Sequence, residues 1–171
     1  RGVRRFELDV QLAADEQLVV LHDARVNRTT GRSGAVDAFT SRELGAMDAR
    51  RGAPPWPRRE GVPTLEAVMR AFPRTESWQL EVKKPARAER LRITLEALRE
   101  LVTRLRLGPR VIVTSSNTAV LEMARQVAPR LARGYVCTKM DPLPIAEEFG
   151  CRMVVANLFT CTPALRLVGL D

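Results

Sequence analysis

The sequence predicts an α/β protein in which parallel strands form a sheet flanked by helices. Two observations predict this class. Short apolar strand patterns alternate with helical patterns along the chain, and a long amphipathic helix pattern separates the third strand pattern from the fourth. The 171 residues are 45% hydrophobic and 28% charged, which is ordinary for a globular protein and excludes a disordered tail or a disulfide scaffold.

The first two strand patterns lie close together in the chain. Residues 6–10 alternate apolar and acidic side chains, which places Glu7 and Asp9 on one face of a strand. Residues 18–21 form a second apolar run that leads directly to His22. Carboxylates and a histidine therefore belong to neighbouring predicted strands.

The connection between these two runs is open to two interpretations. Residues 11–17 separate them, which is fewer than a parallel crossover usually needs. A hairpin about Asp15 and Glu16 would place His22 opposite Asp9. Two parallel barrel strands would bring the same groups together at the C-terminal mouth of the barrel. Both interpretations join these groups, and the sequence does not choose between them.

Residues 24–63 are rich in glycine and proline and are predicted to be mostly loop, with one short helix. Thr40 and Glu43 have the spacing of a capping box and predict the start of that helix. Thr64 is predicted to cap the next helix, which Pro73 ends.

The third strand pattern covers residues 78–83, and its alternate residues, including Glu81 and Lys83, share a face. Leucine and valine then recur at helical spacing through residues 88–107, which predicts an amphipathic helix that ends at Gly108.

Three further strand-and-helix units follow. Their strands are predicted at residues 110–114, 134–137 and 153–157, and the last unit has a helix that opens at Pro163. The whole chain thus contains six predicted strands, which supports a mostly parallel sheet.

Charge and composition exclude several classes of partner. The formal net charge is +8, but the arginines are scattered and aromatic residues make up only 5%, so no nucleic-acid partner is expected. No run approaches the ~18 apolar residues of a membrane span, so no stable membrane insertion is expected. Three cysteines, an odd number, suit a reducing compartment and predict a cytoplasmic location. The sequence leaves the oligomeric state open.

The carboxylates on the predicted strands suggest a chemistry. Glu7, Asp9 and Glu81 form an all-oxygen set, which suits Ca²⁺ or Mg²⁺ better than zinc. Lys83 could add a positive charge on the same anion, and His22, the only histidine, could transfer a proton. Taken singly, each residue also fits an ordinary surface or core position. Their placement in one part of the sheet favours metal-assisted cleavage of a phosphate ester.

Six short motifs follow one another in a set order between residues 2 and 83, and more loosely to the end. They are FELDV (6–10), VVLHD (19–23), NRTTG (27–31), GAV with Thr40 and Glu43-Leu44 (34–44), VPTLE (62–66) and LEVK (80–83). In this order they resemble the glycerophosphodiester phosphodiesterase domain family.

The resemblance implies a distorted (β/α)₈ TIM barrel that uses a divalent cation, Ca²⁺ or Mg²⁺, to hydrolyse small-molecule glycerophosphodiesters to an alcohol and glycerol 3-phosphate. It implies that Glu7, Asp9 and Glu81 are metal ligands. It further implies that His22 is one of two acid–base histidines and that Lys83 is a catalytic residue that binds the substrate phosphate. A neighbouring hydroxyl of the substrate would then attack phosphorus through a cyclic phosphate.

The chain also departs from the family pattern. The opening His-Arg-Gly strand and the closing Trp-Thr strand have no counterpart, so residues 1–171 are expected to be one partial domain, a barrel incomplete at both ends. Asp15-Glu16 stands where the family usually has Asp-Gly, and Asn117 where an aromatic residue is common. Two alternatives remain: a non-catalytic scaffold with a residual cation or phosphate site, and a lysophospholipase D-like activity.

Overall fold

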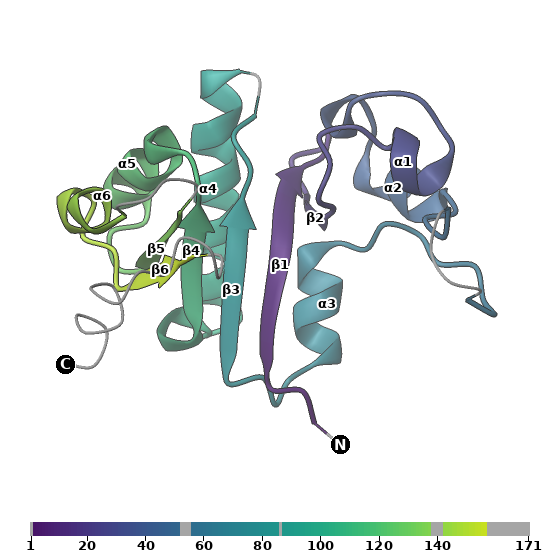
Figure 1. The fold of residues 1–171 in the computed structure, drawn as a ribbon. Helices are drawn as coiled ribbons and strands as arrows, with labels where there is room; N and C mark the ends of the chain where they lie inside the picture. The colour runs from purple at the N-terminus through teal and green to yellow at the C-terminus, as the bar shows by residue number, and fades with distance from the viewer. Residues whose placement is uncertain (1, 52–55, 86, 138–141, 157–171) are drawn as a thin grey trace.

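The computed structural model describes residues 2–51, 56–85, 87–137 and 142–156, and its centre is a six-stranded sheet (Figure 1). The strands lie in the order β2-β1-β3-β4-β5-β6. Every neighbouring pair is parallel except β1 and β2, which are antiparallel. The bounds are Arg5–Leu12 for β1, Leu18–Val20 for β2, Ser77–Val82 for β3, Val111–Ser115 for β4, Ala132–Val136 for β5 and Met153–Val155 for β6. The predicted α/β class and the six strands are confirmed.

Strands β1 and β2 form a hairpin, which decides between the two interpretations of their connection. Leu12 pairs with Leu18, so the turn is centred on Asp15 and not between Asp15 and Glu16. The register is therefore shifted by one residue from the predicted one. The backbone N–H of Leu21 donates to the carbonyl of Asp9 at 3.1 Å, and the expectation that His22 stands opposite Asp9 is wrong.

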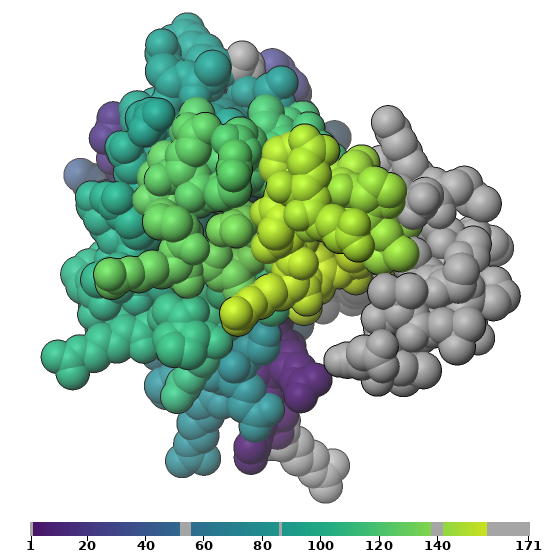
Figure 2. All heavy atoms as spheres, turned by 90° about the vertical axis from the view of Figure 1, so that its left-hand side faces the viewer, coloured from purple at the N-terminus to yellow at the C-terminus, as the bar shows by residue number. Residues whose placement is uncertain are grey.

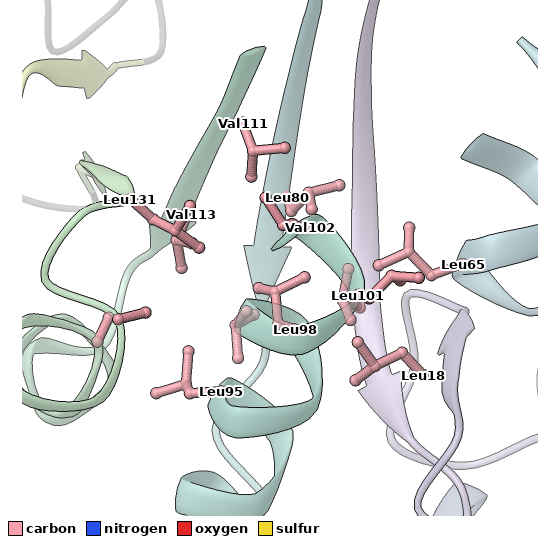
Figure 3. Packing of buried hydrophobic residues seen from close by; sticks show 14 of the residues in the cluster. Leu18, Leu65, Leu80, Leu95, Leu98, Leu101, Val102, Val111, Val113 and Leu131 are labelled. Atoms are coloured by element: carbon pink, nitrogen blue, oxygen red, sulfur yellow. The ribbon is translucent and has the colours of Figure 1, made fainter. Parts of the chain in front are cut away.

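Helices α3 (Leu65–Ala71), α4 (Ala88–Arg104) and α5 (Thr118–Val127) pack on the sheet and form the main core with it. Along β3 the residues alternate between buried and partly exposed, and the buried ones, such as Leu80, join this core. Figure 3 shows the buried leucines of α4, among them Leu95 and Leu98, beside the apolar residues of the central strands. Burial of one face of each strand against these helices holds the sheet in place.

Helix α4 ends at Arg104, three residues before the predicted end. Arg106 adopts a left-handed conformation, with φ of 58°, and its N–H donates to the carbonyl of Thr103 at 3.0 Å. The N–H of Leu107 donates to the carbonyl of Val102 at 2.9 Å, which completes a Schellman closure. The chain thus leaves the helix before it reaches Gly108, which instead opens a short 3₁₀ turn, η2 (Gly108–Arg110).

The segment between β2 and α3 forms a lobe with its own small core, around the buried Val26, Val36 and Leu44. It holds α1 (Asn27–Thr30), the 3₁₀ turn η1 (Val36–Ala38) and α2 (Ser41–Ala46), so it contains more helix than the single short one predicted. The predicted capping box at the start of α2 and the cap at the start of α3 are both present.

The end of the sheet away from this lobe consists of β5, α6 (Leu143–Glu148) and β6, whose green and yellow atoms face the viewer in Figure 2. Strand β5 begins two residues before the predicted 134–137 segment. The helix predicted to open at Pro163 lies outside the described residues, as does Cys161. Among the described residues, no helix is long and apolar enough to cross a membrane.

Candidate functional site

Sheet register brings the predicted carboxylates together. In the parallel pairing of β1 with β3, Glu7 is opposite Gln79 and Asp9 is opposite Glu81. Because strand side chains alternate between faces, Glu7 and Asp9 lie on the same face as Glu81, opposite the helix-covered core. One ligand oxygen from each of these three carboxylates lies within 4.8 Å of the others. The three predicted ligands therefore form one cluster, the carboxylate cluster.

Lys83 follows the end of β3 and reaches back into the carboxylate cluster. Its Nζ lies 2.8 Å from Oδ1 of Asp9 and 2.6 Å from Oε1 of Glu81. Burial alone would lower the pKa of Lys83, but the hydrogen bonds with Asp9 and Glu81 outweigh it, and the net shift is upward. The ammonium group is thus held in its charged form beside two of the carboxylates.

Glu7 responds to the crowding of negative charge. Its pKa is raised above the ordinary value, first by partial burial and then by the charges of Asp9 and Glu81, while Lys83 and His22 act in the opposite direction. The three carboxylates and the single ammonium leave a formal charge of −2 in this cluster. A further cation would relieve this excess.

The carboxylate cluster fits a hard divalent cation. Ca²⁺ takes oxygen ligands at about 2.3–2.6 Å, so two oxygens on one ion are at most about 5 Å apart. The cluster meets this limit with three oxygens, and the formal charge of −2 that it has together with Lys83 matches the charge of the ion. Asp9 and Glu81 are partly buried, with side chains 20% and 16% exposed, and Glu7 is more exposed, which leaves a path to the cluster from solvent.

Thr114 of β4 is opposite Glu81 in the register. Its hydroxyl oxygen is buried and has no hydrogen-bond partner in the part of the chain that the structure describes. The sequence analysis gave Thr114 no role, although two polar residues, Thr114 and Ser115, at the end of an apolar strand are a usable signal.

His22 lies two residues after the end of β2, the strand that pairs with β1. Its main-chain carbonyl accepts a hydrogen bond from Nε2 of Gln11 at 3.2 Å, and Gln11 continues the Glu7–Asp9 face of β1. The imidazole is 65% exposed and makes no hydrogen bond to the carboxylate cluster among the described residues, yet it is near enough to lower the pKa of Glu7. His22 therefore lies beside the cluster rather than within it.

Three residues near His22 were not given a role from the sequence: Gln11, Asp23 and Arg28. The signal for Gln11 is its place as the next alternate residue after Asp9. Asp23 bonds to the ring of His22, and Arg28 bonds to Asp23. No spacing rule for regular strands or helices pairs residues five apart across an irregular loop, so the last contact could not be read from the sequence.

Comparison with known proteins finds a family model and named relatives that match this chain. The model of the glycerophosphoryl diester phosphodiesterase family matches residues 1–168. A glycerophosphodiester phosphodiesterase of Caldanaerobacter subterraneus subsp. tengcongensis is 33% identical over 96% of this chain and 68% of its own length. The putative glycerophosphodiester phosphodiesterase YhdW of Bacillus subtilis is 47% identical over 46% of this chain and 32% of its own length. The chain thus spans about a third to two thirds of these relatives.

Solved structures agree in fold. A putative glycerophosphoryl diester phosphodiesterase from Silicibacter pomeroyi matches with a TM-score of 0.83 at 22% identity, over 98% of this chain and 69% of its own. A phosphodiesterase from Oleispira antarctica, in complex with the product sn-glycerol-3-phosphate, matches with a TM-score of 0.82 at 21% identity, over 98% and 70% of the two chains. The predicted TIM-barrel class of the phosphodiesterase type is confirmed, and the six strands form part of such a barrel.

Proposed function

This chain belongs to the glycerophosphoryl diester phosphodiesterase family, and we propose that the intact protein hydrolyses small-molecule glycerophosphodiesters to an alcohol and glycerol 3-phosphate. The observation that carries the proposal is the carboxylate cluster with Lys83 inside it, on strands that fall within the region matched to the family. The Caldanaerobacter relative bears the name of this activity, and the Oleispira enzyme was solved with glycerol 3-phosphate as its product.

The carboxylate cluster would hold the cation. Glu7, Asp9 and Glu81 supply three oxygen ligands and the negative charge that Ca²⁺ or Mg²⁺ requires. When bound, the cation supplies polarisation of a phosphoryl oxygen and stabilises negative charge that develops there. The choice between the two ions depends on ligands beyond these three.

Lys83 and His22 would act on the substrate directly. The ammonium of Lys83 is held between Asp9 and Glu81, where it can bind a phosphate oxygen as charge builds up. His22 has an exposed imidazole beside the cluster and would transfer a proton at the ester oxygen. Attack by the neighbouring substrate hydroxyl, through a cyclic phosphate, then needs no protein nucleophile. The second acid–base histidine that the family resemblance implies has no counterpart in these 171 residues.

The test is a product assay on the intact protein. Release of glycerol 3-phosphate from glycerophosphocholine is measured after removal of divalent cations with EDTA and after addition of Ca²⁺ or Mg²⁺. Turnover is expected to disappear with EDTA and to return with one of the ions. Glu81→Gln is expected to lower it at least about a hundredfold, because a polarising cation contributes several kcal/mol and each 1.4 kcal/mol is tenfold in rate.

Glu89→Gln is the matched control, since Glu89 is exposed in the first turn of α4 and lies outside the carboxylate cluster. It is expected to retain full turnover. A folded intact protein that binds the cation but releases no glycerol 3-phosphate would contradict the proposed hydrolysis. That result would favour the binding scaffold. Release of the head-group alcohol from a lysophospholipid alone, with lysophosphatidate as the other product, would favour the lysophospholipase D-like alternative.

A further inference from the structure

Asp23 binds the imidazole of His22, and Arg28 binds Asp23. These two charged residues are here called the imidazole clamp. Nδ1 of His22 lies 2.8 Å from Oδ1 of Asp23. The guanidinium of Arg28 forks onto the same carboxylate, with Nε 2.7 Å from Oδ2 and Nη2 3.0 Å from Oδ1. Nε2 of His22 makes no hydrogen bond to any residue that the structure describes.

Donor and acceptor chemistry fixes the direction of these bonds. The hydrogen bonds from Arg28, and then that from His22, hold the pKa of Asp23 well below its usual range, so the carboxylate is ionised at neutral pH. An ionised carboxylate only accepts hydrogen bonds, and therefore Nδ1 of His22 must carry a proton. In the neutral ring this leaves the lone pair on Nε2, which is the opposite of the tautomer that an unconstrained imidazole favours.

The imidazole clamp is itself anchored. Arg28 lies in α1, which follows the fully buried Val26. The side chain of Asn27 closes the loop around it, accepting from the N–H of Gly34 at 3.3 Å and donating to Oγ of Ser33 at 3.2 Å. On the other side, Gln11 of β1 binds the carbonyl of His22. The sheet thus holds the backbone of His22, and the lobe holds the loop that carries Arg28.

We propose that Asp23 and Arg28 are positioning residues that lock His22 in its Nδ1–H tautomer and present Nε2 as the atom that takes or gives the proton. Asp23 and Arg28 act through His22 and need no contact with substrate. The kinetic consequence of this inference rests on the proposed function, whereas the tautomer is a property of the chain itself.

The tautomer can be measured directly because His22 is the only histidine in the 171 residues. After labelling with ¹⁵N-histidine, the NMR spectrum of the chain contains the nitrogen signals of one imidazole ring. At a pH where the ring is neutral, we expect a protonated Nδ1 and an unprotonated Nε2. In Asp23→Asn the amide can donate to Nδ1, and in Asp23→Ala the acceptor is lost, so both variants are expected to shift the ring towards the Nε2–H form.

Asp48→Asn is the matched control. Arg50 forks onto Asp48 in the same manner, with distances of 2.7 and 2.6 Å, but this pair does not touch the imidazole. The control is expected to leave the tautomer unchanged. The inference is overturned if the unaltered chain shows the Nε2–H form, or if both folded Asp23 variants keep the Nδ1–H form.

The kinetic measurement uses the intact protein. Asp23→Asn is expected to lower kcat by on the order of 10²- to 10⁴-fold with little change in KM, because the wrong tautomer disables proton transfer without removing phosphate contacts. Asp48→Asn is expected to keep the full kcat. Active protein whose Asp23 variants retain kcat would overturn the positioning role and leave the proposed function intact. A locked tautomer in a protein without diesterase activity would overturn the proposed function and support the tautomer lock.

Discussion

Leu80 and Glu81 are consecutive residues of β3, but they belong to different parts of the molecule. Leu80 is fully buried in the core between the sheet and its helices. Glu81 points to the other face, where it joins Asp9 and binds Lys83. The same alternation along β1 separates Val10 in the core from Asp9 in the carboxylate cluster.

This difference shows that one face of a strand stabilises the fold while its other face carries the candidate site. The helix-covered face gains free energy from buried apolar area, and its residues can be exchanged only for others of similar volume. The polar face holds three carboxylates close together, and this arrangement gains little stability: partial burial, and then the charges of Asp9 and Glu81, raise the pKa of Glu7. Substitutions on the two faces should therefore alter different measured quantities.

The largest expected effect is on the apolar face. Leu80→Ala should lower the free energy of unfolding by about 2–5 kcal/mol, because it leaves a cavity in a closely packed core. Urea denaturation of the chain measures this change. The neighbouring Glu81→Gln should cost less than about 1 kcal/mol. A larger loss from Glu81→Gln than from Leu80→Ala would refute the division between the faces.

The second largest expected effect is a change in the cation affinity of the polar face. Lys83→Met removes the ammonium that lies between Asp9 and Glu81, so its repulsion of an incoming ion disappears. Calorimetric titration should show Ca²⁺ or Mg²⁺ binding about tenfold tighter or more, equivalent to about 1.4 kcal/mol.

Lys84→Met is the control for this titration, because Lys84 is the adjacent, exposed lysine. It should leave the cation affinity unchanged. Turnover of the intact protein should fall in Lys83→Met alone, since binding of the ion improves while the contact with phosphate is lost. Weaker cation binding in Lys83→Met would show that Lys83 supports the carboxylate cluster rather than competing for it.

A smaller effect concerns pH and the helices that cover the apolar face. Arg104 of α4 forks onto Glu66 of α3, and the hydrogen bonds from Arg104 and Arg70 lower the pKa of Glu66 to about 2. Because this pKa is below its unfolded value, the stabilisation is present above about pH 4.5 and is lost as the pH falls towards 2. The pair is partly exposed, so the loss should be about 0.5–1 kcal/mol.

Urea denaturation between pH 6 and pH 3 measures this loss, and Glu66→Gln should remove that part of the pH dependence. Glu100→Gln is the control, since Glu100 is exposed on α4 and approaches Arg99 only at 3.8 Å. Equal pH dependence in Glu66→Gln and in the unaltered chain would contradict the assignment of this pair.

The last effect, of similar size, is expected at the turn between β1 and β2, which belongs to neither face. Glu16 has a left-handed backbone with φ of 60°, where a side chain costs about 1–2 kcal/mol. Glu16→Gly should raise the free energy of unfolding by about 0.5–1 kcal/mol, after the entropy of glycine in the unfolded chain is subtracted. Glu16→Ala keeps the strained conformation, so equal stability of the two variants would argue against strain at this position.

The fold was predictable where the signal is local. Alternation along residues 6–10 and the helical spacing along residues 88–107 depend on neighbours in the chain, and both patterns correspond to observed elements. The exact ends were less predictable, because they depend on single backbone conformations. The turn centred on Asp15 shifted the hairpin register, and the left-handed Arg106 ended α4 early.

The candidate site shows the same limit. Glu7, Asp9, Glu81 and Lys83 could be placed together because a parallel register of alternating strands has few variants. The contact between Asp23 and Arg28 could not, because it depends on the path of an irregular loop. In strands and helices the sequence pattern thus predicts where a side chain lies, whereas contacts in loops depend on tertiary packing.

The lobe between β2 and α3 leaves the sheet and returns to it at almost the same point. The N–H of Val20 donates to the carbonyl of Pro63 at 3.0 Å, and Val19 pairs with Thr64. A segment whose ends are tied together can change length with little effect on the framework that carries it, since the entropy of loop closure grows slowly with length. Insertions and deletions during evolution would therefore accumulate in this lobe. Because the lobe lies beside His22, they would change which substrates fit there while the strands stay the same.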